Sequence, residues 1–194
     1  MLEQLLPMPD AEVYLVTGFF SPAESGALLT DLTANIAWEQ KAINIMGKQV
    51  MQPRLIAWYG DVGKSYRYSG LTVHPLPWTP TLLDMKARVE AAANVTFNSV
   101  LLNLYRDGQD SVGWHSDDEP ELGTNPVIAS ISLGAARTFQ FKHKQNADLK
   151  QSVELTHGSL LLMRGTTQHY WKHQIPKTKK PLSARINLTF RVIQ

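Results

Sequence analysis

The sequence contains no cysteine. Without thiols the chain can form neither a disulfide framework nor a thiolate metal site. Any bound metal ion must therefore be held by histidine, aspartate or glutamate, and these ligands favour a hard or borderline ion.

Long hydrophobic segments are also missing. No apolar run approaches the length needed to span a bilayer, and residues Met1–Gln4 lack the basic start of a signal peptide. We therefore expect an intracellular protein without membrane contact, cytoplasmic in a bacterium and nuclear in a eukaryote. The length of 194 residues and the 43% hydrophobic content suit one domain with a sizeable core.

The net charge is only +2, but the charges are unevenly distributed. Residues 172–194 contain six lysines or arginines and no acid, and residues 40–60 contain three basic residues and no acid. Acidic residues gather instead between Asp107 and Glu121. A basic rim around an acidic pocket would suit a substrate that carries phosphate, although ordinary solvated surface charge explains the pattern as well.

The stretch from 99 to 119 is the most informative part of the chain. It reads as a strand and a turn, followed by a polar cluster centred on His115 and Asp117. Side chains two residues apart in an extended segment point to the same face, so this imidazole and carboxylate are presented together. One more imidazole would complete the two-histidine, one-carboxylate set that suits non-haem iron. Alone, the triplet is more typical of a surface turn with a hydrogen-bonded histidine.

Two further segments have polar faces. Asn103 and Tyr105 share one face of an apolar strand, and residues 185–191 alternate without a break. A half-buried antiparallel strand with its polar face in water would explain the second pattern. If Arg185 faced inward, its guanidinium would instead be a bidentate clamp for a carboxylate.

Four ordered motifs resemble those of a known family. They are Asn-x-Tyr at 103–105, His-x-Asp-Asp-Glu at 115–119, Trp-x-His-x-Ile-Pro at 171–176 and Arg-x-Asn-Leu-Thr-Phe-Arg at 185–191. Together they closely resemble the AlkB family of Fe(II)- and 2-oxoglutarate-dependent dioxygenases. The resemblance is closest to the branch that repairs alkylated bases in duplex DNA, through further matches at 52–54, 59–61, 69–71 and 129–134.

The element pattern predicts an α+β protein. A capping box at Ser21 and a cap at Thr79 start two helices, and alternating strands follow. We expect a double-stranded β-helix, or jelly roll, with the helices packed outside and an N-terminal nucleotide-recognition hairpin region. Residues 1–194 would form a single domain, with a lid at about 40–75 and the jelly-roll core at 99–194. The core strands expected are 99–105, 127–133, 138–143, 151–155, 159–163, 168–174 and 183–192.

The resemblance also implies a cofactor site and a reaction. His115, Asp117 and His173 match the family's catalytic Fe(II) ligands, and Arg185 matches the residue that grips the distal carboxylate of 2-oxoglutarate. With O2, such an enzyme oxidatively demethylates N-alkylated bases such as 1-methyladenine and 3-methylcytosine in DNA, releasing formaldehyde, succinate and CO2. The other matches to the 2-oxoglutarate pocket are Asn103, Tyr105, Thr189 and Arg191.

The substrate side follows from the same resemblance. A base inside a duplex must be flipped out to reach a buried metal. Tyr68 and His115 match the residues that sandwich this base, and Tyr68 stands where phenylalanine is usual. A hairpin around Met46 would contact the DNA, and Met46 stands where an aromatic wedge is usual. Tyr66, Asp118 and Glu119 match the polar groups around the base edge. Gly47, Lys48 and Arg54 belong to the hairpin region and would also contact the substrate.

Three alternatives stay open at this point. The same chemistry could act on methylated RNA or on a protein side chain, although the basic 40–60 segment favours nucleic acid. A non-catalytic nucleic-acid-binding module would have lost a metal ligand, whereas all three are present. A metal-binding jelly roll without activity would leave Arg185 and Arg191 without a purpose. We expect a monomer that acts on alkylated DNA, single- or double-stranded.

The third metal ligand provides the first testable prediction. His169 and His173 have the same parity on the expected 168–174 strand, so periodicity cannot choose between them, and only the resemblance selects His173. We expect His173→Ala to abolish 2-oxoglutarate turnover, measured as succinate release, and His169→Ala to retain most of it. The reverse result would contradict the choice of His173.

Overall fold

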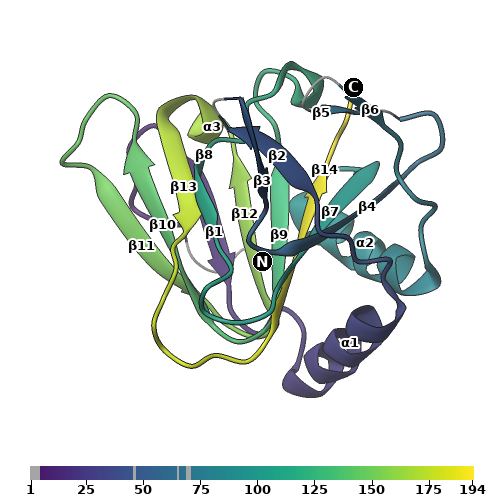
Figure 1. Ribbon diagram of the computed structural model, residues 1–194. Coiled ribbons are helices and arrows are strands. Elements are labelled where there is room, and N and C mark those ends of the chain that lie inside the picture. Colours follow the sequence, from purple (N-terminus) through teal and green to yellow (C-terminus); the bar gives the residue numbers. More distant parts are fainter. Residues whose placement is uncertain (1–4, 46, 65, 69–70) are drawn as a thin grey trace.

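The computed structural model describes residues 5–45, 47–64, 66–68 and 71–194, with backbone only for 43–45, 66–68 and 71–73 (Figure 1). Two antiparallel sheets form its core. The strand orders are β1-β12-β9-β14-β7-β4 in the larger sheet and β11-β10-β13-β8 in the smaller one. This is the expected jelly-roll architecture. No helix within the described ranges has the length and hydropathy that crossing a membrane requires.

The bounds of the strands agree closely with the sequence pattern. The larger sheet contains β1 (Glu12–Val16), β12 (Ser159–Arg164), β9 (Ile128–Gly134), β14 (Arg185–Arg191), β7 (Ser99–Tyr105) and β4 (Leu55–Gly60). The smaller sheet contains β11 (Lys150–Leu155), β10 (Arg137–His143), β13 (Trp171–Ile175) and β8 (Val112–His115). Two strands of the larger sheet, β1 and β4, thus come from outside the predicted 99–194 core.

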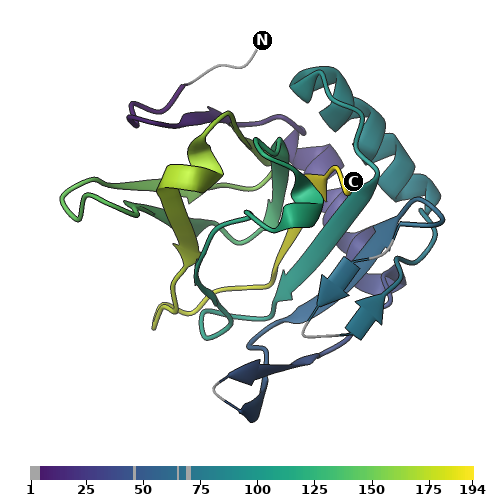
Figure 2. The same cartoon turned by 90° about the horizontal axis from the view of Figure 1, so that it is seen from above.

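Two long helices cover the larger sheet. Helix α1 (Pro22–Asn35) begins with the predicted capping box, in which Glu24 N donates to Ser21 Oγ at 3.3 Å and Ser21 N donates to Glu24 Oε2 at 2.8 Å. Helix α2 (Pro80–Ala93) is capped by Thr79, as predicted. Figure 2 shows both helices on the side of the larger sheet that faces away from the smaller sheet.

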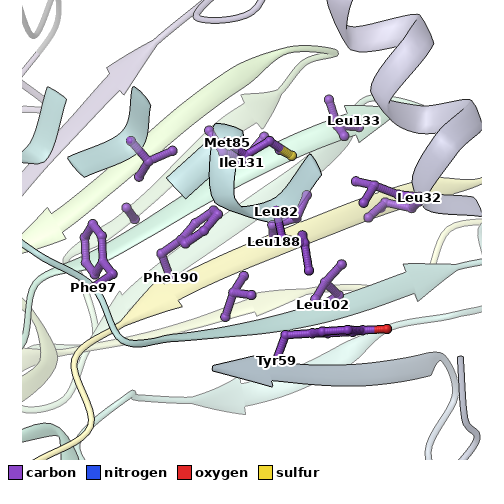
Figure 3. Close-up of a cluster of buried hydrophobic side chains, with 14 of the residues drawn as sticks. Leu32, Tyr59, Leu82, Met85, Phe97, Leu102, Ile131, Leu133, Leu188 and Phe190 are labelled. Atoms are coloured by element: carbon purple, nitrogen blue, oxygen red, sulfur yellow. The ribbon is translucent and has the colours of Figure 1, made fainter. Parts of the chain in front are cut away.

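The hydrophobic core is divided between the two faces of the larger sheet. On the helix side, Leu82 and Met85 of α2 pack with Leu102, Leu188 and Phe190 of the sheet (Figure 3). A second cluster lies between the sheets and contains aromatic and aliphatic side chains from both, among them Phe139, Phe141, Leu161 and Trp171. The polar residues of β14 must therefore face the space between the sheets, because its apolar residues face the helices.

The register of β14 brings polar side chains together. This strand lies between β9 and β7, and Arg185 is opposite both Gly134 and Tyr105. Two residues further along, Asn187 is opposite Ser132 and Asn103. The strands thereby place three rows of polar side chains between the sheets.

The predicted 168–174 strand is partly wrong. Residues Thr167–Tyr170 form a short helix, α3, and the strand β13 begins only at Trp171. The helix turn is stabilised by the Thr167 hydroxyl, which donates to Arg164 O at 2.6 Å. His169 and His173 therefore belong to different elements, and their shared parity has no structural meaning.

Smaller elements complete the chain. The predicted hairpin is present as β2 (Ala42–Ile45) and β3 (Lys48–Met51), and Gly47 has a positive φ of 79°. Met46 lies outside the described residues. A second hairpin consists of β5 (Tyr66–Tyr68) and β6 (Leu71–Val73), and a 3-10 helix, η1, covers Pro120–Leu122.

The packing of β14 predicts a large cost for truncating Leu188, which is fully buried against the helices. Leu188→Ala should lower the free energy of unfolding, measured by denaturant titration, by about 2–5 kcal/mol because a cavity is left. Leu83→Ala, at a side chain that is 47% exposed, is the control and should change it by less than about 0.5 kcal/mol. Equal effects of the two substitutions would contradict the packing described.

Candidate active site

Three potential metal ligands converge between the sheets. His115 is the last residue of β8, Asp117 follows two residues later, and His173 lies on β13 directly opposite His115. One ligand atom from each residue lies within 4.8 Å of the other two. Strand pairing thus unites residues that are far apart in the sequence.

The two imidazoles are oriented for metal binding. Nδ1 of His115 lies 2.8 Å from Gly113 O, which can only accept, so Nδ1 carries a hydrogen and Nε2 is the nitrogen left for a metal ion. Burial, together with the neighbouring His115, lowers the pKa of His173 to about 3, against the opposing effect of Asp117. His173 is therefore neutral near pH 7, as a metal ligand must be.

Asp117 is a carboxylate in an enclosed place, with only 3% of its surface exposed. Burial by itself would raise its pKa, but Arg191, with His173 and His115, outweighs burial and holds the pKa below its usual value. Arg191 Nη2 donates to Asp117 Oδ1 at 2.6 Å. Oδ2 lies 3.8 Å from His173 Nε2, too far for a hydrogen bond, and is left to face the imidazoles.

These features fit Fe(II). Two imidazoles and one carboxylate oxygen lie close to a common place without bonding to each other. This is the donor set that leaves positions open on non-haem iron. Residues 115, 117 and 173 could therefore hold the ion that the sequence predicts there.

A cavity of about 70 Å³ adjoins the three ligands. The residues predicted for 2-oxoglutarate all line it, together with Arg54 and several residues that the sequence analysis did not assign to the pocket. The predicted lining residues are Asn103, Tyr105, Arg185, Thr189 and Arg191, and the additional polar ones are Ser130 and Asn187.

Arg185 is the most unusual group in this cavity. It is 1% exposed, and only Nη2 has a hydrogen-bond partner, the hydroxyl of Ser132 at 2.9 Å. Nε and Nη1 are buried without one. Burial lowers the pKa of Arg185 to about 10, so the group remains charged near pH 7. Among the described residues, no carboxylate forms an ion pair with it, and a carboxylate of a bound ligand would supply the missing partner.

The neighbouring polar groups are held by one another. Thr189 Oγ1 donates to Asn187 Oδ1 at 3.1 Å, and Asn187 Nδ2 donates to Ser130 Oγ at 2.7 Å. Arg54 reaches the same cavity, where its Nε donates to Asn103 Oδ1 at 2.7 Å. Strand parity could have identified Asn187, whereas Ser130 and the contact of Arg54 depend on pairing between distant strands.

The residues predicted to contact substrate are more scattered. Asp118 lies outside the cavity and accepts from Lys144 Nζ at 2.9 Å, and Glu119 beside it is half-buried. Lys48 is exposed on the hairpin. Tyr66 and Tyr68 lie on β5, where only the backbone is described.

Fold and donor set together are those of a non-haem iron oxygenase that uses 2-oxoglutarate. In agreement, residues 12–191 match the 2OG-Fe(II) oxygenase superfamily. The solved structure of OsALKBH1 superposes with a TM-score of 0.69 over 99% of this chain and 100% of that chain, at 16% identity, which shows a shared fold.

Curated relatives narrow the assignment. The chain is 43% identical over 198 residues to the mouse alpha-ketoglutarate-dependent dioxygenase alkB homolog 3, covering 97% of this chain and 68% of the relative. It is 42% identical to the cattle DNA oxidative demethylase ALKBH2, covering 91% and 67%. The chain thus spans about two thirds of these relatives, and it belongs to the AlkB family of 2-oxoglutarate- and Fe(II)-dependent dioxygenases.

The environment of Arg185 predicts a specific effect of a conservative substitution. Arg185→Lys should raise the KM for 2-oxoglutarate roughly 10- to 150-fold, since a lost charge-assisted hydrogen bond costs on the order of 1.5–3 kcal/mol. Steady-state succinate release measures this. Arg88→Lys, at a surface arginine that bonds Glu24, should leave the KM unchanged. An unchanged KM in Arg185→Lys would show that Arg185 does not bind the co-substrate.

Proposed function

We propose that this protein repairs DNA by oxidative demethylation of N-alkylated bases such as 1-methyladenine and 3-methylcytosine. It would consume 2-oxoglutarate and O2 and release formaldehyde, succinate and CO2. The observation that carries the proposal is the buried Arg185, which has no counter-ion within the described part of the chain and lies in the same cavity as His115, Asp117 and His173. The names of the relatives, a dioxygenase and a DNA oxidative demethylase, support the same reaction class.

The metal ion and each of its three ligand residues would have a distinct role. Bound Fe(II) supplies the redox chemistry that activates O2 while 2-oxoglutarate is decarboxylated. His115 and His173 would each offer a ring nitrogen, and Asp117 would offer Oδ2 because Arg191 occupies Oδ1. Phe139 stacks on His173, with ring centroids 5.1 Å apart, and holds the imidazole plane in place.

The residues of the co-substrate pocket would bind and orient 2-oxoglutarate. Arg185 would receive the distal carboxylate of 2-oxoglutarate through Nε and Nη1, which have no hydrogen-bond partner among the described residues. Tyr105, whose ring centroid lies 5.1 Å from the Arg185 guanidinium carbon, holds that guanidinium from one side. Because these groups are already buried and fixed, little reorganisation is needed when the ligand enters.

The substrate end of the proposal rests on sequence. A flipped base would stack on Tyr68 and lie against His115, with Tyr66, Asp118 and Glu119 near its polar edge. Oxygen insertion into the N-methyl C–H bond gives a hydroxymethyl group, which leaves as formaldehyde when its C–N bond breaks and the proton of its hydroxyl is released. The unmodified base is then restored.

The function is tested by product release from methylated oligonucleotides. Wild-type protein should release formaldehyde and succinate with methylated DNA, and Asp117→Ala should release neither because one metal ligand is lost. Asp84→Ala, an exposed position on α2, is the matched control and should behave as wild type. If only methylated RNA supported formaldehyde release, the assignment to DNA would be overturned.

The hairpin predicts a difference between duplex and single-stranded DNA. If Met46 fills the gap left by an extruded base, it offsets an unstacking cost that a single strand never incurs. Met46→Ala should then lower kcat/KM on methylated duplex more than on the same single strand. Tyr68→Ala should lower both, since a stacking platform contributes about 1–3 kcal/mol per base. An equal loss on both substrates for Met46→Ala would remove the case for a duplex wedge.

A further inference from the structure

The segment that carries Asp117 is irregular. It lies between the end of β8 at His115 and the start of η1 at Pro120, and none of its residues belongs to a strand or a helix. A buried backbone N–H in such a segment has no partner from regular structure and needs one from elsewhere. For Asp117, the partner of this N–H fixes the position of the backbone from which the carboxylate side chain extends.

The partner is the side chain of Gln168 on α3. Its Oε1 accepts from Asp117 N at 2.9 Å, and the side chain is 1% exposed. The other end of the amide, Nε2, donates to Met163 Sδ at 3.6 Å. Because Asp117 N can only donate, the amide has one orientation, with its oxygen toward the metal-ligand segment.

Helix α3 is itself firmly attached. Thr167 accepts from Glu12 N at 2.9 Å, and His169 donates to Asn125 Oδ1 at 3.0 Å. Lys144 Nζ donates both to Gln168 O at 2.8 Å and to Asp118 Oδ2 at 2.9 Å. The helix is thus fixed to neighbouring parts of the chain, and Lys144 links it again to the residue after Asp117.

These contacts fix the carboxylate of Asp117 from two directions. Gln168 holds its backbone nitrogen, and Arg191 holds Oδ1. The remaining oxygen, Oδ2, is left on the side of the imidazoles. Since β13 begins directly after α3, Gln168 also ties the position of Asp117 to that of His173.

We propose that Gln168 is a positioning residue of the metal centre, which sets its affinity for a divalent ion by holding the backbone of Asp117 through α3. The proposal rests on the metal site assigned above. Groups that orient metal ligands typically change metal affinity about 10- to 100-fold when they are removed. Gln168 acts on the ligand's backbone, so its effect depends on whether its oxygen reaches Asp117 N.

The reach of the side chain is the variable to test. Gln168→Leu removes the acceptor, Gln168→Asn keeps an amide that ends one methylene short, and Gln168→Glu keeps an oxygen at the original distance. The control is Gln174→Leu, because Gln174 lies on β13 next to His173 but uses its amide to bond Gln140 at 2.7 Å. Mn(II) is titrated into each metal-free 194-residue protein and followed by its EPR signal. Thermal unfolding of the metal-free proteins reports on folding.

We expect Gln168→Leu and Gln168→Asn to bind Mn(II) about 10- to 100-fold more weakly than wild type. Gln168→Glu and Gln174→Leu should stay within about threefold of wild type, because each leaves an oxygen in reach of Asp117 N. If Gln168→Leu does not fold, the comparison of Gln168→Asn with Gln168→Glu is sufficient to test the proposal. Unchanged affinity in Gln168→Asn, or an equal loss in Gln168→Glu, would overturn the proposal. Wild-type binding that survived Asp117→Ala would instead overturn the metal-site assignment, and the role of Gln168 with it.

Discussion

The burial of charge on and beside β14 is the constraint on which the rest of this structure depends. Asp117, Arg185 and Arg191 all lie between the sheets, where an unpaired ion costs several kcal/mol. The alternation of β14 places Arg185 and Arg191 on this face, and Arg191 in turn binds Asp117, while the other face of β14 packs Leu188 and Phe190 against the helices. The two faces of β14 thus carry the packing residues and the site residues, and any movement of the strand would displace both sets.

The described residues do not fully neutralise these buried charges, and the sites left over are where a metal ion and a co-substrate would bind. Asp117 has one oxygen bonded to Arg191, while the other faces the two imidazoles. Arg185 has no carboxylate partner among the described residues. A divalent metal and a dicarboxylate would complete both environments, and their binding would stabilise the folded state. The co-substrate and the metal would therefore stabilise the interior of the protein as well as take part in the reaction.

Much of the fold could be predicted from the sequence, because alternation and capping are local signals. The strand 99–105 and the cap at Thr79 are examples. Segment 168–174 was misassigned because its alternation does not reveal that Thr167–Tyr170 turns as a helix. The motifs predict three metal ligands that the structure brings together, but they do not predict Gln168, since its contact with Asp117 joins residues 51 positions apart. The bond from Arg54 to Asn103 was missed for the same reason.

The central claim is that one cavity holds a metal and a dicarboxylate at opposite ends of β14's polar face. A crystal structure of the protein with Mn(II) and 2-oxoglutarate, grown without O2, tests it most directly. We expect the ion to be bound by His115, Asp117 and His173, and the distal carboxylate to be hydrogen-bonded to Arg185. A metal bound elsewhere would contradict the account. So would a distal carboxylate that bonds Arg191 and displaces Asp117 from it.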